Sequence, residues 1–210
     1  MIVAEVLICC LIGYGLGNIN PSYFFARKKG YDVRKDGSGN AGASNALILA
    51  GKSAFFVTAL MDIFKAYLAC RICRALFPAL PVAAQVGGVA CILGHMFPVL
   101  LRFQGGKGLA CLGGVILAWS WQWFFLLLFL AALVAFVTRY VCVVAPAFSV
   151  IFPACYACRT EKLMGALILL IPAIPIFAKH WENFRRIRQG TELRMSYLWN
   201  KEEELRRIGR

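Results

Sequence analysis

The chain has 210 residues, 60% of them apolar, and its mean hydropathy is +0.70, whereas a soluble domain is about 45–50% apolar. Charged residues make up only 16% of the chain, yet the formal net charge is +13. These values exclude an ordinary soluble domain. They also argue against nucleic-acid binding, because the basic residues are not interleaved with aromatic residues on any soluble segment.

Seven apolar segments are predicted to cross a membrane, since a span needs about 20 apolar residues and fewer in a tightly packed bundle. In chain order they are residues 2–25, 53–76, 80–101, 109–121, 124–137, 141–158 and 163–178. The first has no basic region before it and no convincing cleavage site, so we interpret it as a retained span and not a signal peptide.

Several residues within these segments predict how the spans pack. Gly13 and Gly17, four residues apart, favour close helix packing. Asp62 and Lys65 are three residues apart within the second span and are expected to pair, because unpaired charges in a membrane are costly. Tryptophans between the fourth and fifth spans fit an interfacial belt. Prolines in the last span are expected to kink it; they are Pro172 and Pro175.

The distribution of basic residues predicts the topology. With the N-terminus outside, the inner segments 26–52, 102–107, 139–140 and 179–210 hold eighteen Lys and Arg residues, and the outer segments hold four. The sequence therefore predicts an all-α membrane protein with seven transmembrane helices and a cytoplasmic C-terminus. Residues 1–210 are expected to form one integral-membrane domain, with 193–210 as a charged cytoplasmic tail. In this topology three polar clusters lie on the cytoplasmic side, whereas six or eight spans would separate the third from the others.

The first polar cluster, residues 36–45, is a loop of small residues after the first span. Glycines let the backbone approach a ligand and direct its N–H groups toward an anion, and serine and asparagine side chains add polar partners. The alternative is a flexible turn with helix caps, because serine and asparagine are also common there. The sequence of this cluster alone leaves both interpretations open.

The second cluster, residues 94–98 and 103–108, adds a cation. Gly105, Gly106, Lys107 and Gly108 open a helix, where backbone N–H groups and the helix dipole favour an anion. The segment is not a Walker A loop, because the spacing and the Ser/Thr are missing. His95 precedes Lys107 by about four helical turns, and we do not expect the two side chains to touch.

The third cluster, residues 180–192, begins where the last predicted span ends. His180, Asn183 and Arg186 recur every three residues and therefore share one helix face. Such a stripe could hold a phosphate and position a hydroxyl group. The alternative is a basic segment beside the membrane that binds lipid headgroups.

The nine cysteines include two CxxC spacings, at residues 70–73 and 155–158. A metal or redox site would require both pairs to meet, and no histidine lies near them in the sequence. We therefore interpret the cysteines as small apolar packing residues and expect no metal site.

Taken together and in order, the three clusters resemble the acyl-phosphate-dependent glycerol-3-phosphate acyltransferase family of bacteria, PlsY. The likeness covers essentially the whole chain. It is carried by three motifs: Ser38-Gly39-Asn40-x-Gly42-Ala43-Ser44-Asn45; Gly94-His95-x-Phe97-Pro98 with Gly105-Gly106-Lys107-Gly108; and His180-x-x-Asn183-x-x-Arg186-x-x-x-Gly190-Thr191-Glu192.

The resemblance implies an enzyme of the bacterial inner (plasma) membrane with its active site facing the cytoplasm. Such an enzyme transfers a fatty acyl group from acyl phosphate to the 1-hydroxyl of sn-glycerol 3-phosphate, giving lysophosphatidic acid and inorganic phosphate, the first step of phospholipid synthesis. No cofactor or metal is implied. The expected partners are the two substrates and membrane lipids, with functional coupling to an acyl-phosphate synthase.

The resemblance also assigns site residues. The catalytic or phosphate-contacting positions are Ser38, Lys107, His180 and Asn183. Ser38 and Asn183 are expected to orient the hydroxyl or carbonyl, Lys107 to neutralise phosphate charge, and His180 to hydrogen-bond phosphate or substrate. The expected substrate-binding residues are Gly39, Asn40, Gly42, Ser44, Asn45, Lys52, His95, Gly105, Gly106, Gly108, Arg186, Gly190 and Glu192.

Three positions depart from the family pattern. Ile48 stands where the family has an arginine implicated in holding glycerol phosphate, Gln104 replaces a lysine, and Ser44 replaces a threonine. Lys52, one helical turn after Ile48, is expected to take over, although lysine lacks the bidentate fork of arginine. Two alternatives follow: a diverged relative with another acceptor or no activity, and a carrier for a phosphorylated solute. Against a carrier, the sequence has no evident inverted repeat.

Overall fold

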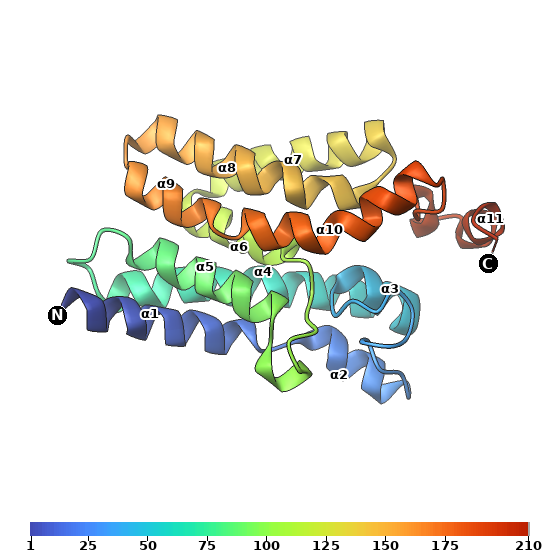
Figure 1. The fold of residues 1–210 in the computed structure, drawn as a ribbon, viewed down its shortest axis with the longest axis horizontal. Helices are drawn as coiled ribbons and strands as arrows, with labels where there is room; N and C mark the ends of the chain where they lie inside the picture. Colours follow the sequence, from blue (N-terminus) through green and yellow to red (C-terminus); the bar gives the residue numbers. More distant parts are fainter. Residues whose placement is uncertain (210) are drawn as a thin grey trace.

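The computed structural model describes residues 1–209, and within them the chain forms only helices joined by turns (Figure 1). The first part contains α1 (Ile2–Gly17), α2 (Pro21–Lys28), α3 (Ala43–Ala50), α4 (Lys52–Leu76), α5 (Ala83–Met96) and the short 3-10 helix η1 (Val99–Leu101). The second contains α6 (Leu109–Trp119), α7 (Trp121–Thr138), η2 (Val141–Val143), α8 (Val144–Thr160), α9 (Leu163–Leu170), α10 (Ala173–Arg188), η3 (Met195–Leu198) and α11 (Lys201–Arg207). The predicted all-α class is confirmed.

Within residues 1–209, six helical segments are long and apolar enough to cross a membrane: Ile2–Lys28, Lys52–Leu76, Ala83–Leu101, Trp121–Thr138, Val141–Thr160 and Leu163–Arg188. The predicted fourth span corresponds to α6, which is apolar but has only 11 residues and is therefore about 16 Å long. That is roughly half the thickness of the hydrocarbon core of a bilayer. The count of seven spans and the orientation of the termini stay predictions.

The first predicted span is interrupted, because α1 ends at Gly17 and α2 begins at Pro21. Proline lacks the N–H that would continue a helix, and the Asn20 side chain accepts a hydrogen bond from Tyr23 N and so caps α2. Lys65 of α4 donates to the carbonyl oxygens of Gly17 (3.2 Å) and Ile19 (2.6 Å). The lysine thus satisfies carbonyl groups that the interruption exposes.

Two further helix ends have local causes. Ser120 accepts a hydrogen bond from Trp123 N and begins α7, so a break between the fourth and fifth predicted spans is present, but it lies at Ser120 and not at residues 122–123. Pro172 lies between α9 and α10, so the predicted kink is confirmed there. Pro175 lies in the first turn of α10, where a helix needs no N–H donor.

Glycines hold several helices in backbone contact. A Cβ added at Gly13 of α1 would overlap the carbonyl oxygen of Gly87 in α5, and one added at Gly17 would overlap that of Cys91. The close packing predicted for this pair of glycines is therefore confirmed. Gly114 of α6 is equally close to the carbonyl oxygen of Ile63 in α4.

The cysteines of the first CxxC pair pack as small apolar groups. The Sγ atoms of Cys73 and Cys70 fill the space above Gly87 and Gly88 of α5, where a Cβ would overlap them. All nine cysteines are free thiols. Cys158 of the second pair is exposed, so this pair and the first do not form one buried cluster.

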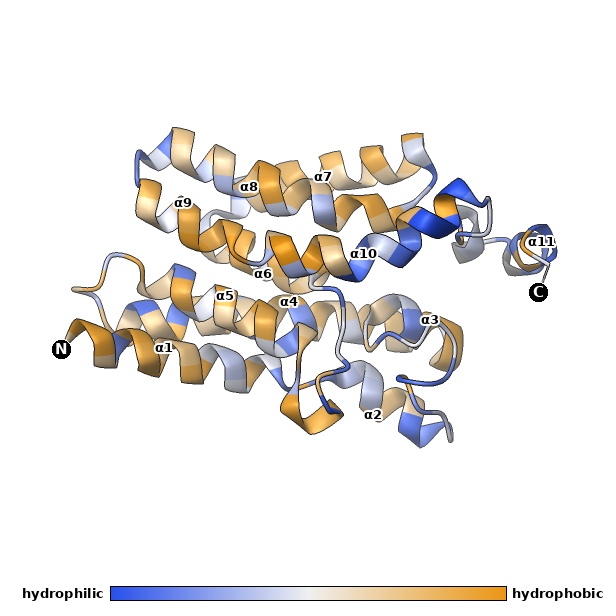
Figure 2. Ribbon diagram, in the orientation of Figure 1, coloured by the Kyte–Doolittle hydropathy of each residue, from blue (hydrophilic) through white to orange (hydrophobic). Residues whose placement is uncertain are grey.

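The helices form two layers, with α1 to α5 on one side, α7 to α10 on the other, and α6 between them (Figure 1). Apolar residues cover most of both layers, while hydrophilic residues gather over the end of α10, α11 and the end of α2 (Figure 2). Many large apolar side chains are exposed, as expected for a surface that faces lipid. The first and third predicted clusters lie toward this polar end, and the second, in the loop between η1 and α6, lies nearer the middle of the molecule (Figure 1).

Candidate functional site

The first cluster is a loop folded around the buried side chain of Asn45. Its Oδ1 accepts a hydrogen bond from Ser38 N (2.8 Å), and its Nδ2 donates to the carbonyl oxygens of Val33 and Asp36 (both 3.1 Å). Gly37 lies at φ +66°, and a Cβ there would overlap Asn45 Oδ1. Asn45, predicted to bind substrate, therefore shapes the loop from within.

The remaining polar groups of this loop are more accessible. Ser38, Gly39 and Ser44 are exposed and Asn40 is half-buried, whereas Gly42 is buried at the N-cap of α3. Gly39 has φ +67°, a conformation that favours glycine. The loop is therefore a braced turn that exposes a hydroxyl group from a backbone that Asn45 fixes, and its binding of a ligand stays a prediction.

The second cluster folds back onto the end of α5. Gly105 N donates to Met96 O (3.2 Å) and Gly106 N donates to His95 O (3.0 Å). A Cβ at Gly106 would overlap His95 Nε2 and would lie 3.0 Å from the carbonyl oxygen of Ala41. His95 therefore supports the glycine segment, which in turn lies against the loop of the first cluster.

His95 belongs to a buried polar group that the sequence revealed only in part. Asp62 and Lys65 form the predicted ion pair (2.7 Å), and His95 Nδ1 lies 3.1 Å from Lys65 Nζ and 3.4 Å from Asp62 Oδ1. Asp62, His95 and Cys111 also have the spacing of metal ligands. The Lys65 ammonium already neutralises Asp62 and would repel a metal ion, so this group fits a structural role.

Lys107 lies immediately before the start of α6. Gly108 has φ +87° and forms the N-cap, so the first N–H groups of α6 point out of the helix beside the lysine. Lys107 Nζ donates a hydrogen bond to Asn183 Oδ1 of α10. Burial lowers the pKa of Lys107, Glu192 opposes this effect and Arg186 adds to it. The lysine and the helix terminus together favour an anion.

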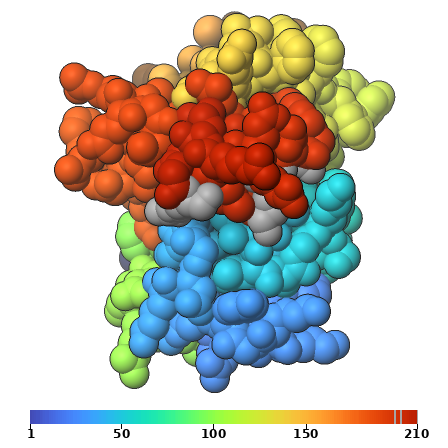
Figure 3. Space-filling model, turned by 90° about the vertical axis from the view of Figure 1, so that its right-hand side faces the viewer, coloured from blue at the N-terminus to red at the C-terminus, as the bar shows by residue number. Residues whose placement is uncertain are grey.

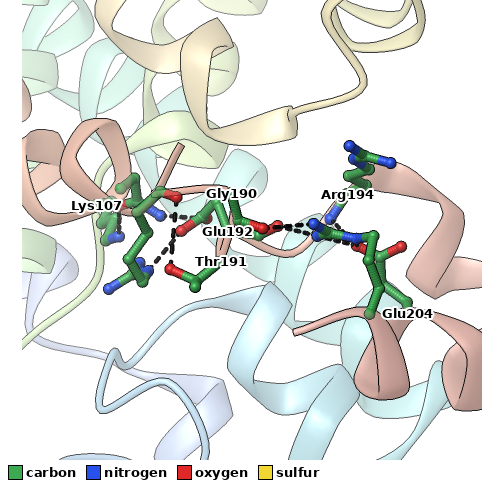
Figure 4. A network of polar contacts seen from close by, with 9 residues as sticks. Lys107, Gly190, Thr191, Glu192, Arg194 and Glu204 are labelled. Atoms are coloured by element: carbon green, nitrogen blue, oxygen red, sulfur yellow. Dashed lines mark hydrogen bonds and ion pairs between the residues drawn. The ribbon is translucent and has the colours of Figure 1, made fainter. Parts of the chain in front are cut away.

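The third cluster is held together by Glu192. Asn183 Nδ2 donates to Glu192 Oε1 and Arg186 Nε donates to Glu192 Oε2, both at 2.6 Å (Figure 4). Gly190 has φ +72°, and the turn it allows is closed by Thr191 N and Glu192 N donating to Arg186 O. Asn183 is thereby fixed to donate to Glu192 and to accept from Lys107.

His180 and Asn183 both lie on the buried face of α10, which confirms the predicted stripe, and Arg186 continues it. His180 Nδ1 lies 2.7 Å from Ile176 O. Because a carbonyl oxygen only accepts, Nδ1 carries the proton in this contact, and Nε2 of the neutral ring is left as an acceptor.

Lys179 is a nearby cation that the sequence analysis missed. Its Nζ donates to Met96 O (2.7 Å) and Gly105 O (3.3 Å), and it lies 4.9 Å from the centre of the Phe97 ring. It fastens α10 to the glycine segment. Its position directly before His180 was the only indication in the sequence.

The structure brings Lys107, Asn183, Arg186 and Glu192 into direct contact and places Gly106 between His95 and the first loop. The first loop, α3 and the segment after α10 lie on one end of the molecule (Figure 3). Ile48 is half-buried in α3, and Lys52 is exposed at the first residue of α4. No described contact joins Lys52 to the other site residues.

This fold and site define a multi-pass helical membrane protein with a polar, cationic site where the start of α6 meets α10. Comparison with known proteins is consistent with that class. The glycerol-3-phosphate acyltransferase family profile matches residues 7–190. The chain belongs to the glycerol-3-phosphate acyltransferase family.

Several relatives and solved structures share most of their length with this chain. A glycerol-3-phosphate acyltransferase of Coxiella burnetii is 41% identical over 192 residues, which are 89% of this chain and 96% of the relative. One of Rubrobacter xylanophilus is 35% identical, covering 90% and 94%. The crystal structure of PlsY, an integral membrane glycerol 3-phosphate acyltransferase, in its glycerol 3-phosphate form is 28% identical, with a TM-score of 0.79, covering 92% and 96%. Its lysophosphatidic acid form gives a TM-score of 0.80.

Proposed function

We propose that this protein transfers a fatty acyl group from acyl phosphate to the 1-hydroxyl of sn-glycerol 3-phosphate. The hydroxyl oxygen attacks the acyl carbonyl carbon, the bond from that carbon to the phosphate oxygen breaks, and the departing phosphate takes up the hydroxyl proton. The products are lysophosphatidic acid and inorganic phosphate. The observation that carries the proposal is Lys107 at the N-terminus of α6, hydrogen-bonded to Asn183.

The proposed roles follow from what each group can donate or accept. Lys107 and the N–H groups of α6 stabilise the charge that develops on the leaving phosphate. Ser38 and Asn183 orient the hydroxyl or the carbonyl. His180 uses its free Nε2 to accept a hydrogen bond from the attacking hydroxyl. The leaving group is already good, so this scheme needs no protein nucleophile.

Arg186 and the glycine segments are proposed to bind the substrates. Gly39 and Asn40 of the first loop, with Gly105, Gly106 and Gly108, let the backbone approach two anionic phosphates. Arg186 provides a second cation near Lys107 and is neutralised by Glu192 until a phosphate arrives. The apolar acyl chain lies between helices at the lipid-facing surface.

The short length of α6 favours a recessed site. If the tryptophans after α6 lie at one membrane interface, a helix of about 16 Å begins well below the opposite surface. A reactive carbonyl on a lipid-embedded acyl chain could then reach Lys107 without leaving the membrane. We propose that this opening faces the cytoplasm of a bacterial inner membrane, where an acyl-phosphate synthase would supply the donor.

The test is phosphate release by the purified protein in lipid, given palmitoyl phosphate with and without glycerol 3-phosphate, with the lipid product identified by mass. We expect acceptor-dependent release, formation of lysophosphatidic acid, and loss of both in a His180→Ala variant. No release from the wild type would contradict the proposal and favour a relative with another acceptor. Counterflow of labelled glycerol 3-phosphate across vesicles would instead identify a carrier.

Replacing Ile48 with arginine is expected to lower the KM for glycerol 3-phosphate by about tenfold, because a bidentate guanidinium–phosphate contact contributes roughly 1.5–3 kcal/mol. Ile48 lies on α3, directly after the loop that presents Ser38. Ile48→Met, which adds no charge, is the matched control and should leave KM within about twofold. An unchanged KM in Ile48→Arg would mean that this chain holds glycerol phosphate by other cations.

A further inference from the structure

The C-terminal segment holds the loop that carries Glu192. Arg207 of α11 donates from Nη1 to Gly190 O (2.6 Å) and from Nη2 to Glu192 O (2.5 Å) (Figure 4). One guanidinium group therefore binds both ends of the three-residue turn 190–192. The family match covers residues 7–190, so α11 lies beyond it.

Glu204 fixes the guanidinium group of Arg207. Its Oε1 accepts from Arg207 Nε (2.9 Å) and from Arg194 N (2.9 Å), and its Oε2 accepts from the Ser196 hydroxyl (2.9 Å). Burial by itself would raise the pKa of Glu204, but the bonds from Arg207, Arg194 and Ser196 lower it below its usual value. Glu204 is only 4% exposed and is fully engaged in holding this segment.

A continuous chain of hydrogen bonds connects Arg207 to Lys107. Arg207 holds the backbone of Glu192, and the side chain of Glu192 accepts from Asn183 and Arg186. Asn183 in turn accepts from Lys107. A change in the position of the 190–192 turn would therefore alter the orientation of the Asn183 side chain. It would also alter the distance between the cationic groups of Lys107 and Arg186.

We propose that Arg207, held by Glu204, is a positioning residue for the acyl-transfer site and acts through Glu192. Among the residues that the structure describes, Arg207 donates to the turn and to Glu204 and to no other group. The kinetic part of this inference rests on the proposed function, and the structural part does not. Because a guanidinium group reaches two carbonyl oxygens at once and an ammonium group is a point charge, lysine should replace it only in part.

The kinetic test compares Arg207→Met with Arg206→Met, which removes the same charge from an exposed neighbour on the same helix. We expect Arg207→Met to lower kcat/KM for glycerol 3-phosphate about tenfold, since hydrogen bonds to charged groups are typically worth one to two factors of ten. Arg206→Met should stay within about twofold, and Arg207→Lys should lie between them. Equal effects of the two methionine variants would overturn the proposal.

A double-variant cycle tests whether Arg207 acts on the acyl-transfer site through Glu192. In a Glu192→Gln background, Arg207→Met should lower kcat/KM by less than about twofold further, because the group through which it acts has already been altered. A full tenfold loss in that background would show that Arg207 acts independently of Glu192, and the proposal would fail.

Amide hydrogen exchange tests the structural part without any enzyme assay. The amides of residues 190–192 are hydrogen-bonded in this turn and should exchange at least about tenfold faster in Arg207→Met than in Arg206→Met. Unchanged exchange would overturn the inference even if the enzyme is active. Faster exchange in a protein that shows no acyl transfer would support the positioning contact and reject the proposed function separately.

Discussion

Replacing Lys107 with methionine is expected to lower kcat/KM for acyl transfer by about 10²–10³-fold, the usual effect of removing one preorganised donor from developing charge. Lys107 carries a full positive charge next to the N-cap of α6, and its hydrogen bond to Asn183 of α10 orients its ammonium group toward α10. The measurement is the initial rate of phosphate release with limiting glycerol 3-phosphate. Arg102→Met removes an exposed cation from the same loop and should cost no more than about threefold.

The pH dependence provides a second test of this lysine. Burial lowers the pKa of Lys107, so it loses its proton at a lower pH than an exposed lysine would. Because the protonated form binds phosphate, kcat/KM should fall as pH rises through this lowered pKa. Lys107→Arg, whose guanidinium group stays protonated throughout the pH range of the assay, should move the alkaline limb to higher pH. An unchanged limb, or a methionine variant with normal kcat/KM, would remove Lys107 from the proposed mechanism.

The second large effect is expected on stability, from Lys65→Met. Removing one partner of a buried ion pair leaves an uncompensated charge and typically costs about 3–5 kcal/mol. Here Asp62 is 1% exposed and Lys65 is 5% exposed, and Lys65 also donates to Gly17 O and Ile19 O. Thermal unfolding in one detergent, followed by the loss of helical signal, should show a clearly lower Tm.

The control for this prediction is the double variant Asp62→Asn/Lys65→Met, which removes both charges. It should recover part of the lost Tm, since no unpaired charge remains, but not all of it, because two carbonyl groups still lose their donor. A single variant with the wild-type Tm, or a double variant less stable than the single one, would contradict the buried-pair interpretation.

The sequence predicted the helical class and the packing of glycines well, because helix period, apolar length and small-residue spacing are local properties. The stripe of His180 and Asn183 on α10 was predictable for the same reason. The interruption between α1 and α2 was missed. Pro21 and two asparagines mark it in the sequence. The group that satisfies its exposed carbonyl oxygens in an apolar environment is Lys65, which lies 46 residues after Ile19.

The functional assignments of single residues were less predictable. Asn45 lies in a motif that resembles a ligand-binding loop, yet its side chain makes three hydrogen bonds to the backbone between residues 33 and 38. The His95 ring packs against Gly106, and this contact depends on how the segment at Gly105 and Gly106 folds back onto the end of α5. Arg207 and Lys179 were not distinguishable from other basic residues near a membrane, because only the tertiary fold decides which cation meets a backbone carbonyl group.

The glycine contacts described above divide the molecule into parts of unequal tolerance to change. Where Gly13, Gly17 and Gly114 let a backbone oxygen approach, no larger residue fits, so α1, α4, α5 and α6 form a frame whose geometry is set by main-chain atoms. In α7 only Leu127 and Ala135 are buried. Substitutions and attached labels should therefore be tolerated in α7 with little effect on the site. The four-helix frame, by contrast, fixes the position of Lys107 and should tolerate few changes.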